Sequence, residues 1–224
     1  SMAVSGNTDI YRVSAQGGAP VRLTNSPGID VGGSYSPDGR QIVFESDRSG
    51  GQQIYVMNAD GSGSTELAAD FFGSFDQTVW APDGKSLLSL VGDHGVLSLY
   101  RVGLDGKTTQ VATNIGGASI GRPYADGSFS VSGGKKPVVA YTAGFADRPS
   151  EVASIGLDGK GRQVLTALND DLIPYLEMPK MEEIKVASSH DGKEIEAWVA
   201  LPPDFKADGS FQAIVNKWFE APAK

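Results

Sequence analysis

Short stretches of alternating apolar and polar residues recur along the first 165 positions of the chain. IYRV at 10–13, IYVM at 54–57 and LYRV at 99–102 begin 44 and 45 residues apart, and a looser copy, VASI, begins at 152. Alternation with a period of two is typical of β-strands that bury one face, and no run over this stretch keeps a helical period. The pattern therefore predicts an all-β protein with a repeat of about 45 residues.

Turn signals fall between these strands at a regular spacing. Asp-Gly pairs begin at positions 38, 60, 83, 105, 126, 158, 191 and 208, and the first four intervals are 22, 23, 22 and 21 residues. Asp-Gly supplies the left-handed backbone that a tight hairpin turn requires. Two hairpins per period make four strands, and a four-stranded unit of this length is one blade of a β-propeller.

The predicted strands group into blades. Residues 29–70, 71–115 and 116–168 each supply one full blade. Residues 8–24 supply two further strands and residues 183–201 a hairpin. If these two ends pair, they complete one more blade and remove exposed sheet edges. We therefore expect a closed ring of about four blades, with an open half-propeller that dimerises to eight blades as the alternative.

The charge and composition change which partners are expected. The formal net charge is -8 with a pI near 4.7, and no Lys/Arg cluster interrupts it along the sequence. Such a chain repels phosphate backbones and anionic lipid headgroups, so we expect neither nucleic acid nor a membrane as partner. Cysteine is absent, which excludes disulfides and thiolate chemistry. No apolar run reaches the length of a membrane span.

Residues 8–63 resemble the TolB family, the periplasmic propeller proteins of the bacterial Tol-Pal envelope system. The resemblance is carried by LTNSPG at 23–28, SYSPDGRQIVFESDR at 34–48 and QIYVMNADG at 53–61. It implies a protein-binding module of the periplasm with an envelope lipoprotein as partner. Self-association is the other partner that the open-ring alternative suggests.

Residues 70–205 resemble a second family, the prolyl oligopeptidases, in particular their acylaminoacyl-peptidase-like branch. The resemblance is carried by LTALNDDL at 165–172, SSHDGKEIEAW at 188–198 and LPPDF at 201–205. It implies a propeller that restricts the access of substrates to a hydrolase domain. Residues 211–224 do not match the next strand of that family.

Two resemblances in one chain favour an engineered or recombined chimera with no enzymatic activity of its own. The alternative is a divergent natural peptidase propeller whose early blades resemble TolB. The expected segments are an expression remnant or N-terminal arm at 1–7, TolB-like blades at 8–70, peptidase-like blades at 71–168, a linker and closing hairpin at 169–205, and a tail at 206–224.

One motif matches a hydrolase nucleophile. Residues 117–121 read GASIG, which places Ser119 in the G-x-S-x-G pattern of a strand-to-helix elbow. Arg122 and Pro123 follow where the helix would begin, and no helical period comes after them. We therefore expect a structural strand here, and no catalytic residue.

The remaining polar motifs do not form a metal or cofactor site. His94 and His190 both fall in predicted turns, where we expect them to be solvated. Residues 58–66 resemble a calcium loop, but Ala69 stands where the twelfth-position ligand is needed, so we expect a plain hairpin turn. No cofactor is expected.

Two loops remain as candidates for binding. Asp47, Arg48, Asp147 and Arg148 lie after central strands, where propellers present binding surfaces. The alternative is that these exposed acid-base pairs are only solvated. A group of aromatic residues at strand positions is expected to pack between neighbouring blades. The group comprises Phe71, Phe72, Phe75, Trp80 and Tyr100.

Overall fold

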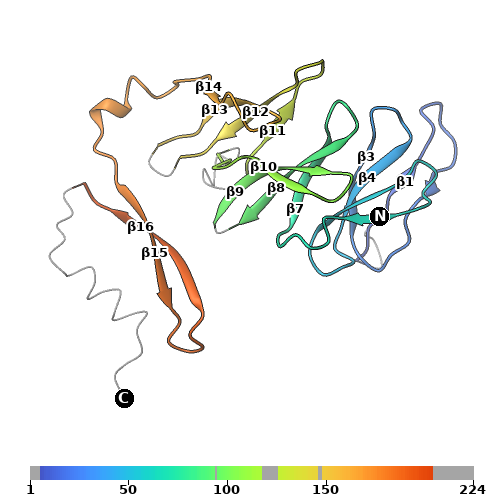
Figure 1. Cartoon of the computed structure of the whole chain (residues 1–224), viewed down its shortest axis with the longest axis horizontal. Coiled ribbons are helices and arrows are strands. Elements are labelled where there is room, and N and C mark those ends of the chain that lie inside the picture. Colours follow the sequence, from blue (N-terminus) through green and yellow to red (C-terminus); the bar gives the residue numbers. More distant parts are fainter. Residues whose placement is uncertain (1–5, 94, 118–125, 146–147, 204–224) are drawn as a thin grey trace. The chain divides into compact units, whose positions relative to one another are not determined.

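The structure, a computed structural model, describes residues 6–93, 95–117, 126–145 and 148–203 of the 224-residue chain. Its strands form three four-stranded and two two-stranded antiparallel sheets, which confirms the all-β, propeller-like repeat (Figure 1). The chain divides into two units. Unit 1 consists of Ser1–Gly144 and Ser150–Thr166, and unit 2 of Phe145–Pro149 and Ala167–Lys224.

Unit 1 contains the three four-stranded sheets, each with its strands in chain order. The first sheet is formed by β3 (Asp30–Tyr35), β4 (Gln41–Ser46), β5 (Gln53–Asn58) and β6 (Thr65–Leu67). The second is formed by β7 (Phe75–Trp80), β8 (Ser86–Asp93), β9 (Val96–Gly103) and β10 (Thr108–Ala112). The third is formed by β11 (Phe129–Val131), β12 (Val138–Ala143), β13 (Glu151–Gly156) and β14 (Gln163–Val164). A two-stranded sheet, β1 (Tyr11–Arg12) and β2 (Val21–Arg22), precedes them.

The predicted Asp-Gly turns connect these strands. In six of the eight pairs the glycine has φ between +65° and +93°, a region that a residue with a Cβ disfavours. In the same six pairs the aspartate Oδ1 accepts a hydrogen bond from the backbone N–H two residues later, at 2.9 to 3.3 Å. Local sequence alone therefore determines these turns.

The pair Asp126-Gly127 differs from the other described pairs. Asp126, rather than the glycine, has the positive φ, and the pair leads into β11 instead of closing a hairpin. A Cβ on Gly127 would lie 2.3 Å from Ile115 Cγ2, so glycine is needed here for close packing. The pair that begins at 208 lies outside the described residues.

The main core lies between the first two full sheets. Its fully buried side chains include Val43, Ile54, Phe75, Leu87 and Val91. On the other face of the first sheet, Ile42, Phe44, Tyr55 and Met57 pack against Ile10 and Leu23 of the segment around β1 and β2. The first full sheet is therefore covered on both faces, by the second sheet and by the segment around β1 and β2, as expected for neighbouring blades.

Polar bonds also connect neighbouring sheets. Glu45 on β4 is buried, and its Oε1 accepts a hydrogen bond from the backbone N–H of Thr78 on β7 at 2.8 Å. Thr78 lies in an irregular part of β7, next to Gln77, which has φ +54°. Trp80 Nε1 donates to the carbonyl of Ser34 at 3.1 Å. These bonds align the second sheet with the first.

Four of the five aromatic residues pack as expected, and Phe72 does not. The Phe71 ring lies 5.2 Å from the Phe75 ring and 5.1 Å from the Tyr100 ring, and Trp80 is buried. Phe72 is 95% exposed. Because Phe71 occupies the space between the sheets, the next side chain along the loop points away from it.

Unit 2 contains a 3-10 helix, η1 (Ile173–Tyr175), and the hairpin of β15 (Lys180–Ala187) and β16 (Glu194–Leu201). The hairpin confirms the strands predicted at 183–201, and eight residue pairs form its ladder. Among the described residues no helix is both long and apolar enough to span a membrane.

The expected closure of the ring is not formed by the described strands. β1–β2 and β15–β16 are separate two-stranded sheets, each paired only within itself. β1 and β2 are two residues long, so they offer a short edge to a hairpin whose strands have eight residues each. The fourth blade inferred from the two ends is therefore not present as one sheet.

Candidate functional site

The loops opposite the Asp-Gly turns bring residues 23–29 and 47–52 together. The Oδ1 atom of Asp47 accepts a hydrogen bond from the backbone N–H of Ile29 at 2.6 Å. A Cβ on Gly28 would lie 2.6 Å from the same oxygen, so this approach requires glycine. Asp47 therefore ties the loop before β3 to the loop after β4.

Arg48 lies at the centre of this loop pair. Its Nη2 atom is 2.7 Å from Asp30 Oδ1, and its Nε donates to Ser46 Oγ at 2.9 Å. The guanidinium carbon lies 4.6 Å from the centre of the Tyr55 ring and 5.3 Å from that of Phe44. A planar guanidinium can form hydrogen bonds at its edge and stack on aromatic faces at once, which an ammonium group cannot.

Asp30 is the buried anion of this pair, with a side chain that is 0% exposed. Burial alone raises the pKa of its carboxyl group, because the charged form loses its hydration. Hydrogen bonds from Ser46, Arg48 and Thr24 outweigh burial, and the pKa lies below its usual value. Asp30 is therefore charged at neutral pH and holds Arg48 in place.

Tyr55 continues the network on β5. Its hydroxyl donates to Glu66 Oε2 at 2.6 Å and lies 3.3 Å from Ser49 Oγ. Burial, followed by the hydrogen bond to Glu66, raises the pKa of the Tyr55 hydroxyl. Glu66 therefore serves this network, and it does not turn toward the loop at 58–62 as a calcium ligand would.

The structure places two of the four predicted binding residues in one network. Asp47 Oδ1 and the Nε and Nη2 atoms of Arg48 make contacts within the protein, and the role of the two residues in binding a partner stays a prediction. Asp147 lies outside the described residues. Arg148 belongs to unit 2, and its guanidinium carbon lies 5.4 Å from the centre of the Phe145 ring.

Sequence reasoning missed Asp30, Tyr55 and Glu66. The contact between Arg48 and Asp30 joins positions 18 residues apart, and Tyr55 faces Phe44 only because of the register of β4 and β5. The period-two pattern does place Phe44 and Ser46 on one face of β4. This was the only part of the Arg48 network that the sequence pattern indicated.

The remaining residues singled out in the sequence are either outside the described residues or in hairpin turns. Ser119 and His94 lie outside the described residues. His190 is exposed in the turn of the β15–β16 hairpin, as expected. The segment that resembles a calcium loop is a hairpin turn, in which Asp60 accepts from the backbone N–H and the hydroxyl of Ser62. Within the described ranges, no three metal-ligating side chains gather.

A groove of about 620 Å³ runs between β6 with its following loop and the β9–β10 turn. Leu67, Phe71 and Leu104 supply apolar walls. Among its charged residues, Glu66 accepts a hydrogen bond from Tyr55, and Lys107 pairs with Asp105 at 3.0 Å. The groove is a seam between two sheets, and Asp70 is a further acidic residue of its lining.

A protein-family model described as "TolB beta propeller domain" matches residues 1–173. Among curated proteins, the "Tol-Pal system protein TolB" of Bordetella pertussis is 56% identical over 55 residues. That match covers 24% of this chain and 13% of the Bordetella protein. The TolB proteins of Bordetella parapertussis and Bordetella bronchiseptica match at the same identity, with 12% of each covered.

Solved structures with a similar fold include TolB proteins and peptidases. TolB from Acinetobacter baumannii superposes with a TM-score of 0.51 at 24% identity, covering 69% of this chain and 36% of that one. The Pyrococcus horikoshii acylaminoacyl peptidase gives 0.57 at 18% identity, covering 85% and 27%. An acylaminoacyl peptidase in complex with Z-Gly-Gly-Phe-chloromethyl ketone gives 0.61 at 17% identity, covering 89% and 28%. At these identities the likeness establishes the propeller fold.

Proposed function

Because this chain belongs to the TolB β-propeller domain family, we propose that it is a protein-binding module without enzymatic activity of its own. The similar TolB proteins are named as parts of the Tol-Pal system. We further propose a periplasmic setting and an envelope lipoprotein as the partner, following the resemblance of residues 8–63.

The observation that carries this proposal is the exposed aromatic ring of Phe72. It stands on the loop between β6 and β7, beside Phe71, which is fixed between Phe75 and Tyr100. An exposed aromatic residue on a rigid base can fill a pocket of a partner at little entropic cost. Asp70, two positions earlier, is also exposed and adds a charged rim.

The test is binding of a purified envelope lipoprotein, measured by calorimetry. We expect Phe72→Ala to weaken binding about tenfold or more, as truncation of a central aromatic anchor does. The matched control is Tyr175→Ala, which removes an 85% exposed aromatic ring from unit 2. Equal binding by both variants, or no binding by the unaltered chain, would contradict the proposal.

A second candidate is a propeller that controls access to a peptidase domain. It is favoured by residues 188–205, which resemble the corresponding peptidase segment, and by the β15–β16 hairpin that part of this segment forms. In that case too, the chain alone should not cleave chromogenic acylaminoacyl substrates. If hydrolysis of these substrates co-purifies with the chain, both candidates are contradicted, since neither has catalytic activity of its own.

We also propose that the chain combines segments of two propeller families, joined near residues 64–70. The 56% identity to TolB extends over 55 residues, while the overall identity to a TolB of known structure is 24%. Sequencing the parent gene tests this proposal. An unbroken natural reading frame that continues into a hydrolase domain would contradict it.

A further inference from the structure

The fold gathers cationic side chains that the sequence scatters. Among the described residues of unit 1, eleven are Lys or Arg, and nine of them lie at the end of the sheets that carries the Asp-Gly turns. We call this end the turn face. Its cations are Arg12, Arg40, Lys85, Arg101, Lys107, Lys135, Lys136, Lys160 and Arg162.

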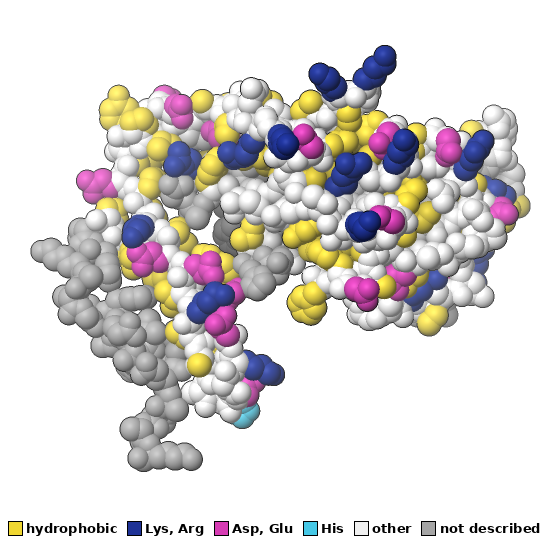
Figure 2. Space-filling view, in the orientation of Figure 1, with side chains coloured by type: hydrophobic (Ala, Val, Ile, Leu, Met, Phe, Trp, Pro, Cys, Tyr) yellow, Lys and Arg dark blue, Asp and Glu magenta, His cyan; other side chains and the backbone are white. Residues whose placement is uncertain are grey.

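Contacts between successive sheets put these turns on one side of unit 1. A Cβ on Gly84 would lie 3.5 Å from Pro37, which brings the β7–β8 turn beside the β3–β4 turn. A Cβ on Gly159 would lie 3.4 Å from the carbonyl of Val111, at the seam between the second and third sheets. Figure 2 shows Lys and Arg side chains spread along this side, in the upper part of the view.

Acidic residues at the turn face are fewer than the cations. They are the aspartates of five turns, Asp38, Asp60, Asp83, Asp105 and Asp158, together with Glu66 and Asp70, which line the groove beside Lys107. Arg40 lies 3.8 Å from Asp38, and Lys107 lies 3.0 Å from Asp105. Such exposed pairs are weak, so these cations can still attract an external anion. Nine cations against seven acidic residues leave the face with a small positive excess.

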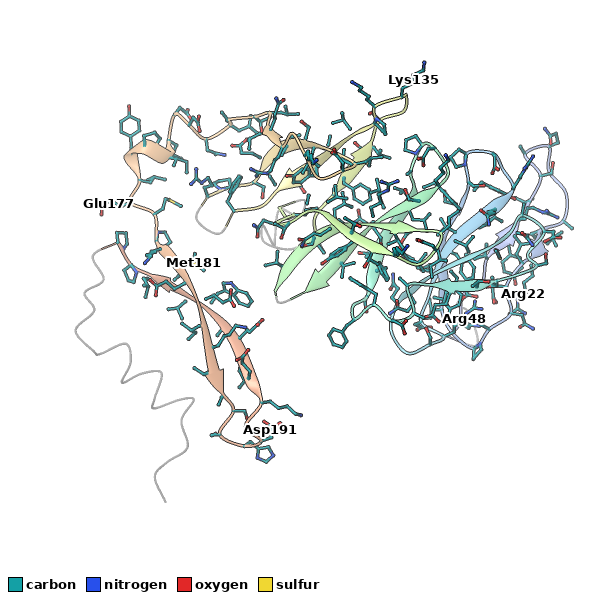
Figure 3. All side chains as sticks on the ribbon, viewed as in Figure 1. Arg22, Arg48, Lys135, Glu177, Met181 and Asp191 are labelled. Carbon is teal, nitrogen blue, oxygen red and sulfur yellow. The ribbon has the colours of Figure 1, made fainter. Side chains whose placement is uncertain are left out.

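The end of unit 1 opposite the turn face carries exposed acidic side chains. Its exposed acidic side chains include Asp47, Asp76 and Asp126. The two cations of unit 1 outside the turn face, Arg22 and Arg48, are paired with Asp9 and Asp30. Figure 3 shows Lys135 at the tip of the β11–β12 hairpin, far from Arg22 and Arg48. Unit 1 is therefore electrostatically polarised although the chain is acidic.

We propose that the turn face docks unit 1 on an anionic lipid surface. At distances near the Debye length, about 8 to 10 Å, a partner experiences the summed charge of the face and not each ion pair. The cations come from separate turns across three sheets, which suits a broad array of headgroups. Of the residues that line the described groove, only Lys107 belongs to this set, so the cations are spread over the face and are not gathered in that groove. We expected no membrane partner from the net charge and from the lack of a Lys/Arg cluster along the sequence, whereas this proposal concerns cations that only the fold brings onto one face.

The experiment measures sedimentation of the whole chain with phosphatidylglycerol-containing vesicles and with neutral phosphatidylcholine vesicles. The test variant is Lys135→Glu with Lys136→Glu, which changes two exposed side chains in a glycine-containing turn. The control is Lys180→Glu with Lys193→Glu, which changes the net charge equally but lies in unit 2. Circular dichroism of each variant verifies that it remains folded.

We expect binding to anionic vesicles alone, with weaker binding as salt increases. The test variant should bind at least about 25-fold more weakly, since a basic residue near an anionic surface contributes about fivefold in affinity. The control should bind like the unaltered chain. Equal losses in both variants, equal binding to neutral vesicles, or binding to duplex DNA without binding to vesicles would each overturn the proposal.

Discussion

At the residue scale, hydroxyl side chains close the loop ends of the outer strand pairs. Thr24 Oγ1 accepts from the N–H of Ile10 at 2.9 Å and lies 3.4 Å from Asp9 Oδ1. Thr166 repeats this arrangement with Val152 and Glu151, and Ser98 bonds to Thr113 in the second sheet. The first full sheet has Ala68 at this place, and the buried Oε1 of Gln53 has no hydrogen-bond partner there.

We therefore predict that Thr24→Val destabilises the fold. Valine has nearly the same shape but leaves the N–H of Ile10 without its acceptor, which costs about 1 to 3 kcal/mol in a buried setting. Urea unfolding measures the free-energy change. The control is Thr65→Val, a threonine exposed on β6, which should change stability by less than about 0.5 kcal/mol. Equal effects would show that the hydroxyl of Thr24 has no special role.

The ion pair between Asp30 and Arg48 gives a pH-dependent prediction. Removal of one partner of a buried pair costs about 3 to 5 kcal/mol, so we expect a loss of this order in Arg48→Ala. Because the pKa of Asp30 is lowered in the folded state, its contribution is complete above the unfolded value of about 3.9. It is lost as the pH falls through the lower folded value. Urea unfolding from pH 7 down to about pH 2 should show a steeper loss of stability below about pH 4 for the unaltered chain than for Arg48→Ala.

At the scale of elements, the turns were predictable because their determinants lie within a few residues. The side chain of Asp38 accepts the amide of Arg40, and Gly39 supplies the positive φ. The network of Arg48 was not predictable in the same way, since its partner Asp30 belongs to another strand. The direction of Phe72 depended on which of two neighbouring rings enters the space between sheets.

Gly39→Ala tests the backbone contribution of one turn. Gly39 has φ +71°, and a Cβ there would meet nothing within 4 Å, so the cost is conformational alone. We expect about 1 to 2 kcal/mol of destabilisation. Gly133→Ala is the matched control, because its Cβ also meets nothing and its φ is not positive. If thermal unfolding changes equally in the two variants, the positive φ is not the cause.

In the hairpin of unit 2, Lys185 lies 3.0 Å from Glu196 and 3.1 Å from Glu194. The hydrogen bonds to Glu196 and then Glu194 raise the pKa of the Lys185 ammonium group. A raised folded pKa means that this contribution is present below the ordinary lysine pKa and is lost as the pH rises through the folded value. The pair is exposed, so it orders the hairpin surface more than it stabilises the fold.

At the scale of the whole molecule, the repeat was predictable and the closure was not. Each four-stranded sheet follows from local turns and alternation, whereas closure depends on whether two distant ends exchange hydrogen bonds. The charge distribution, too, is only partly predictable from the sequence. The sequence gives a net charge of -8, but only the fold reveals that Lys85, Lys107 and Lys160 share one face.

The hydrogen bond from Thr78 to Glu45 has a consequence for recombination among propellers. The carboxylate lies before residues 64–70 and the amide lies after them, so any exchange of parents at that boundary must keep this donor and acceptor matched. Had the incoming segment lacked the irregular backbone at Gln77, the buried Oε1 of Glu45 would have lost this donor, leaving the side chain with the hydrogen bond from Gln52 Nε2 to Oε2 at 2.7 Å. The positions at which two propellers can be recombined therefore depend on buried hydrogen bonds between neighbouring sheets. They depend less on which loop most easily accepts a junction.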